Sequence, residues 1–64
     1  MRPKHVGALM FLLEIAAEDR RYRAKEVLMR EAGNQESREL ARDFRRDAFS
    51  CEDLVKALAE EYPQ

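Results

Sequence analysis

Apolar residues recur at intervals of three and four along two long segments of the chain, residues 3–32 and residues 36–62. This spacing is typical of α-helices, because residues three and four apart lie on the same side of a helix. Nearly all residues of the first segment are good helix formers, and Pro3 suits a first helical turn, where its missing N–H would be unpaired anyway. The pattern therefore predicts an all-α protein with two long helices.

A turn over residues 33–35 separates the two predicted helices. Gly33 is favoured just past a helix end, since glycine accepts the left-handed backbone conformation. Asn34 can begin the next helix by accepting a backbone N–H with its side chain. Two helices of similar length joined by so short a turn make an antiparallel helical hairpin, which we expect to be a single domain over residues 1–64.

The second predicted helix contains one possible break, near Ser50. Ser50 and Asp53 resemble a capping box, which would divide the segment into two shorter helices. The apolar positions nevertheless continue in phase through Ser50, and they are Leu40, Phe44, Ala48, Cys51, Val55, Leu58 and Tyr62. This continuity favours one helix that ends before Pro63.

The first predicted helix carries two apolar stripes on roughly opposite sides. One stripe is expected to pack against the second helix and consists of Val6, Leu9, Met10, Leu13, Ala17, Ala24, Val27 and Leu28. The other consists of Ala8, Phe11, Ile15, Tyr22 and Met29. A single hairpin would leave this second stripe in water, and contiguous exposed apolar patches usually mark interfaces. Phe11, Ile15, Tyr22 and Met29 are therefore predicted to form a dimer or partner interface, most simply in a homodimeric four-helix bundle.

The small size of the chain supports self-association. A core built from 64 residues seldom supplies more than a few kcal/mol of stability. Cys51 is the only cysteine, which excludes an internal disulfide, and His5 is the only histidine, which argues against a structural metal site. A second subunit is the remaining means of stabilisation.

Charged residues make up 39% of the chain, yet the formal net charge is only −1. Most of these residues are expected to form ion pairs along exposed helix faces. The expected pairs are Asp19 with Arg23, Glu26 with Arg30, Glu39 with Arg42 and Glu52 with Lys56, while Arg20 is expected to turn toward Asp47. The near-neutral balance means that attraction to nucleic acid or to an anionic membrane would require a local patch.

One such patch is conceivable on the second helix, opposite its apolar stripe. It comprises Arg38, Arg42, Arg45 and Arg46, with Phe49 among them. These residues could contact phosphates or an acidic protein surface, although the neighbouring acidic residues weaken the phosphate alternative. The simpler interpretation is a solvated helix face.

Nothing in the sequence indicates catalysis or a cofactor. His5 and Cys51 have no partner at catalytic or metal-ligand spacing, and no glycine-rich loop is present to bind a phosphate. The apolar stretch near Glu14 is too short to span a bilayer and is interrupted by that charge, so we expect a cytoplasmic protein rather than a secreted or membrane-bound one. A lone thiol fits a reducing compartment.

The sequence thus predicts a small non-enzymatic protein-binding regulator, of adaptor or inhibitor type, that acts as a homodimeric helical hairpin. An RNA- or DNA-binding accessory protein that uses the arginines of the second helix is the alternative. In length and inferred architecture the chain resembles the Rop family of RNA-binding four-helix dimers. That resemblance involves no shared motif and implies no role for any particular residue.

Overall fold

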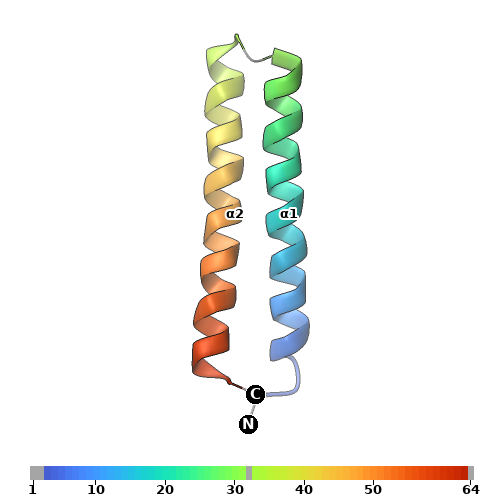
Figure 1. Cartoon of the computed structure of the whole chain (residues 1–64), viewed down its shortest axis with the longest axis vertical. Helices are drawn as coiled ribbons and strands as arrows, with labels where there is room; N and C mark the ends of the chain where they lie inside the picture. The colour runs from blue at the N-terminus through green and yellow to red at the C-terminus, as the bar shows by residue number, and fades with distance from the viewer. Residues whose placement is uncertain (1–2, 32, 64) are drawn as a thin grey trace.

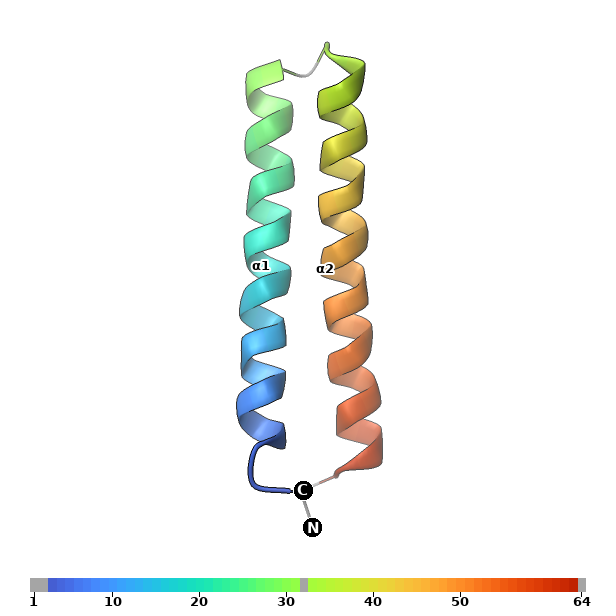
Figure 2. The same cartoon turned by 180° about the vertical axis from the view of Figure 1, so that it is seen from behind.

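The protein is an antiparallel hairpin of two long helices. The computed structural model of the chain describes residues 3–31 and 33–63. Helix α1 spans Val6–Glu31 and helix α2 spans Gln35–Glu61, and the two pack side by side along their whole length (Figures 1 and 2). The hairpin measures 49 × 14 × 11 Å, and the start of α1 and the end of α2 lie together at the end opposite the turn. The predicted all-α hairpin is therefore confirmed.

The start of α1 differs slightly from the prediction. Pro3 precedes the helix instead of occupying its first turn, and its carbonyl oxygen accepts a hydrogen bond from the Val6 N–H at 3.3 Å. The Leu9 N–H then donates to the His5 carbonyl at 3.0 Å, which is the regular helical pattern. Pro3 therefore lies just before the helix, three residues ahead of its first residue, Val6.

Asn34 caps the start of α2 as predicted. Its backbone is extended, with φ −90° and ψ 126°, and its side-chain oxygen accepts the N–H groups of Glu36 at 2.8 Å and Ser37 at 3.3 Å. These two bonds satisfy donors that have no partner within the helix. A third bond ties the helices across the turn, because the buried Ser37 hydroxyl donates to Glu31 Oε2 at 2.8 Å.

Helix α2 continues through Ser50 without a break and ends at its C-cap, Tyr62. The capping box that Ser50 and Asp53 could have formed is therefore absent. A continuous apolar stripe toward α1 gains packing along the whole helix, and this outweighs the local gain of a cap at an interior break.

The predicted left-handed conformation of Gly33 is wrong, because neither glycine has a positive φ. The turn closes instead through a hydrogen bond from the Asn34 N–H to the Glu31 carbonyl at 3.0 Å. A backbone that any residue can adopt is sufficient for this geometry.

We expect Gly33→Ala to raise the free energy of unfolding by about 0.4–1 kcal/mol, because alanine restricts the unfolded chain and fits the native backbone. A Cβ atom at Gly33 would meet nothing within 4 Å. Thermal denaturation of the two proteins at equal concentration measures the effect. A lower melting temperature for the alanine variant would show that the turn does need glycine.

The core between the helices is thin and consists mainly of alanine. Ala17 and Ala24 on α1 and Ala41 and Ala48 on α2 are 1–2% exposed, and Val6 is the other buried apolar residue of the described chain. Each alanine pair is seven residues apart, so it recurs on the same side of its helix after two turns. Small side chains let two helices approach closely, but they bury little apolar area. None of the large described side chains is fully buried.

Candidate interaction surfaces

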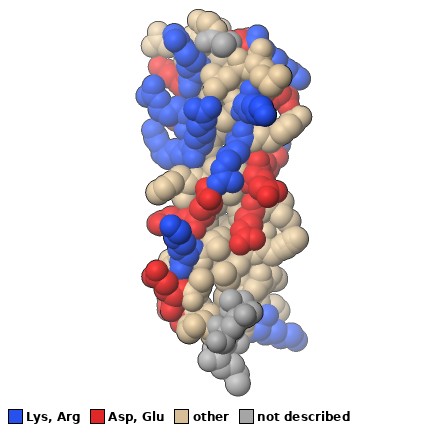
Figure 3. Space-filling view, in the orientation of Figure 1, with Lys and Arg blue, Asp and Glu red and all other residues tan. Residues whose placement is uncertain are grey.

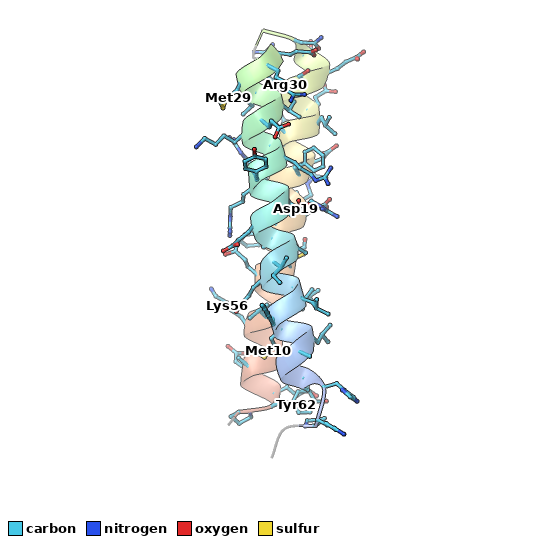
Figure 4. All side chains as sticks on the ribbon, turned by 90° about the vertical axis from the view of Figure 1, so that its right-hand side faces the viewer. Met10, Asp19, Met29, Arg30, Lys56 and Tyr62 are labelled. Carbon is cyan, nitrogen blue, oxygen red and sulfur yellow. The ribbon has the colours of Figure 1, made fainter. Side chains whose placement is uncertain are left out.

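The predicted interface residues of α1 lie on the side of the helix that faces away from α2. Ile15 and Tyr22 each precede a buried alanine by two residues, which places them about 200° from it around the helix. We call Phe11, Ile15, Tyr22 and Met29 the outer ridge. Their exposed fractions range from 49% for Ile15 to 77% for Met29. Figure 4, in which α1 lies in front of α2, shows Met29 projecting from the edge of the helix.

A shallow hollow interrupts the outer ridge near the turn end of α1. Tyr22 and Met29 form its apolar part, and Lys25, Glu26 and Arg30 form its polar part. Apolar side chains bordered by charges of both signs are typical of the rim of a protein-binding surface. The sequence interpretation and the structure therefore agree on where these residues lie and that they are exposed.

A second apolar surface was not anticipated, because all of its residues except Leu54 were assigned to the apolar stripes at the contact between the helices. Leu9 and Val27 lie three residues after the buried Val6 and Ala24, about 60° around α1 from them. Val27 lines a shallow groove together with Leu40 of α2, so the two helices present apolar side chains to the same side of the hairpin. We call this surface the side face; it comprises Leu9, Leu13, Val27, Leu40 and Leu58, with Leu54 at its outer edge, about 120° around α2 from the buried Ala48.

The side-face residues remain half open to solvent. Leu9, Leu40 and Leu54 are 46–53% exposed, while Leu13, Val27 and Leu58 are intermediate. The alanines take the line of closest contact between the helices, so these larger side chains flank that line on one side. Unlike the outer ridge, the side face spans both helices and adjoins the buried core.

The opposite side of the hairpin is polar. Arg21 of α1 forms an ion pair with Glu52 of α2, and a shallow groove beside this pair is lined by Glu14, Glu18 and Lys56. Figure 3 views this side and shows Lys, Arg, Asp and Glu along much of its length. In Figure 4, Lys56 and Asp19 lie on opposite sides of the hairpin. The two sides between the helices thus differ in chemistry.

The ion pairs follow the sequence prediction in part. Asp19–Arg23 at 2.9 Å and Glu26–Arg30 at 3.2 Å were expected and are confirmed. Arg20 pairs with Asp19 at 2.5 Å, so the prediction that it turns toward Asp47 is wrong. Two expected pairs are replaced: Glu52 pairs with Arg21 and not with Lys56. Glu39 accepts a hydrogen bond from Gln35 at 3.4 Å and does not pair with Arg42. One further pair, Arg46 with Asp43 at 3.9 Å, was not predicted. Helix spacing alone cannot indicate pairs formed between the helices.

The arginine face of α2, defined as Arg38, Arg42, Arg45, Arg46 and Phe49, is exposed as predicted. Phe49 is 70% exposed and lies over a small hollow with Glu52, Asp53 and Lys56. Among the described residues, Arg38, Arg42 and Arg45 have no carboxylate within ion-pair distance. Figure 3 shows Lys and Arg gathered over the turn half of the polar side.

The described part of the chain contains no cluster of three or more potential metal ligands. His5 is exposed and Cys51 is half-buried. In residues 3–31 and 33–63, neither helix has an apolar stretch sufficient to cross a lipid bilayer. Comparison of the chain with protein-family models, with curated proteins and with solved structures finds no match.

The chain exposes more surface than a compact protein of its mass. Its accessible surface is 5269 Å², whereas a folded monomer of 7.5 kDa exposes about 4,200 Å². Its radius of gyration is 14.7 Å, against about 10.7 Å for a compact domain of this length. The hairpin thus carries an excess of about 1,000 Å² of surface.

Proposed function

We propose that this protein is a small non-enzymatic regulator of adaptor or inhibitor type, which binds other proteins as a homodimeric four-helix bundle. The observation that supports this proposal is the imbalance between core and surface. Among the residues that the structure describes, four alanines and a valine are the buried apolar residues, while nine large apolar side chains are 46–77% exposed. Exposed apolar surface on this scale is costly in water and usually belongs to an interface.

The two apolar surfaces suit different partners. The side face spans both helices and adjoins the buried alanines, so a second hairpin placed on it would close a common four-helix core. The outer ridge belongs to α1 alone and would stay on the outside of such a bundle. We therefore assign dimerisation to the side face and target binding to the outer ridge, which revises the prediction that the ridge mediates dimerisation.

Light scattering tests the dimer, with an expected mass of twice the 7.5 kDa of the chain. A monodisperse monomer at micromolar concentration would contradict the proposal. Target binding is tested by cross-linking in the native host followed by mass spectrometry.

In the cross-linking experiment, Phe11→Glu is expected to abolish capture of the target while leaving the dimer intact, because Phe11 lies on the outer ridge. Phe49→Glu is the matched control, since it makes the same change at an exposed phenylalanine of α2. Equal capture by both variants and by the unmodified chain would exclude the outer ridge as the binding surface.

A nucleic-acid accessory role is the second candidate, and the unpaired arginines of the arginine face favour it. Guanidinium groups without a carboxylate partner are free to contact phosphates. A fluorescence titration with RNA and DNA duplexes at increasing salt tests this role. Binding that weakens steeply with salt would support it, and no binding at low ionic strength would exclude it.

A further inference from the structure

We propose that the second copy of the chain packs on the side face with its turn at the opposite end of the bundle. This inference rests on the dimer suggested above and adds the direction in which the two hairpins align. Two hairpins could also align with both turns at the same end. The two arrangements bury the same residues but bring different charges together.

The area available matches what such a dimer needs. A stable interface of standard size buries about 800 Å² on each partner, and the hairpin has an excess surface of about 1,000 Å². The side face runs from Leu9 near the start of α1 to Leu40 near the turn. A second hairpin lying along it would cover most of the 49 Å length of the molecule.

The apolar residues of the side face are compatible with the opposed arrangement. A two-fold axis across the middle of the hairpin brings Val27 and Leu40 of one copy level with Leu9 and Leu58 of the other, at 1.5 Å per helical residue. Leu40 would lie between Leu54 and Leu58 of the second copy. The apolar layers would also meet if both turns lay at the same end, so they do not decide the direction.

Charge decides the direction. Residues 20–46, which form the turn half, contain nine Arg and Lys and five Asp and Glu, for a net charge of +4. The described residues of the other half, 3–19 and 47–63, contain two basic and eight acidic residues, for a net charge of −6. Opposed hairpins place each positive half along a negative half, whereas hairpins with both turns at one end place like charges together.

Distance measurement between spin labels at the turn tests the direction. The labelled protein carries Gly33→Cys for attachment and Cys51→Ala to remove the natural thiol, and light scattering first establishes that it is still a dimer. We expect a separation close to the 49 Å length of the hairpin. A separation below half that length would overturn the opposed arrangement but leave the dimer, and hence the proposed function, in place.

The unmodified chain provides an independent test that needs no substitution. The range of electrostatic interaction falls from about 30 Å at 0.01 M salt to about 8 Å at 0.15 M. Attraction between opposite halves would then weaken, so we expect the dimer dissociation constant to rise several-fold over this range of sodium chloride. A constant that falls or does not change would overturn the opposed arrangement, and a protein that is monomeric at both salt concentrations would overturn the dimer itself.

Discussion

Ala48→Leu is expected to lower the free energy of unfolding by about 1–3 kcal/mol, because the substitution overpacks the contact between the helices. Ala48 is 2% exposed and belongs to the alanine pairs that define the line of closest approach. A leucine there must push α2 away from α1 or adopt a strained rotamer. A domain of this size has only a few kcal/mol of stability, so the loss would unfold a large part of the population.

Ala57→Leu is the control for this prediction. It makes the same change on the same helix, but Ala57 is exposed and lies on the side of α2 that faces away from the buried alanines. Its stability should stay within about 0.5 kcal/mol of the unmodified chain. Urea unfolding followed by circular dichroism, at one protein concentration, compares the two variants. Equal midpoints would mean that the helices are not held in close contact at Ala48.

The architecture could be predicted from sequence because its determinants are local. Apolar spacing identified both helices, and Asn34 identified the start of the second one through its capping chemistry. The continuity of the stripe through Ser50 correctly favoured one helix over two. Each of these features depends on residues within one or two helical turns.

The features that were missed depend on how the two helices meet. Leu9 and Leu40 have the spacing of core residues, yet the closest contact is made by alanines, and both leucines are left half exposed. Periodicity assigns a residue to a side of a helix with a precision of about 60°. This precision is too low to separate residues on the line of closest contact between the helices from residues beside that line. The pairing of Arg21 with Glu52 was missed for the same reason, because it crosses from α1 to α2.

The outer ridge could be predicted from the sequence, whereas the side face could not, because the two surfaces lie at different angles from the contact between the helices. The outer ridge lies on the side of α1 opposite its contact with α2, so a moderate error in angle does not assign its residues to the core. The side face lies beside the line of closest contact between the helices. There the same error in angle assigns an exposed residue to the core. Surfaces that border a contact between helices therefore need coordinates for their assignment.

Leu54→Glu is expected to raise the dissociation constant of the proposed dimer at least about tenfold. Leu54 lies in the side face and is 53% exposed in the single hairpin. Fully burying an exposed leucine contributes about 1.5–3 kcal/mol, and about half of this remains to be gained by Leu54 in the dimer. The symmetric dimer would contain two such side chains, and each 1.4 kcal/mol changes the constant about tenfold. The introduced carboxylate adds a desolvation penalty in the same place.

Loss of the proposed dimer should also lower the helix content, since the alanine core of a single hairpin buries little apolar area. Analytical ultracentrifugation and circular dichroism over one dilution series measure both effects. Phe49→Glu is the control, because it removes a more exposed apolar side chain from the same helix, outside the side face. If Leu54→Glu stays as dimeric as Phe49→Glu, the side face is not the interface. If Phe49→Glu alone dissociates, the two hairpins meet through the arginine face instead.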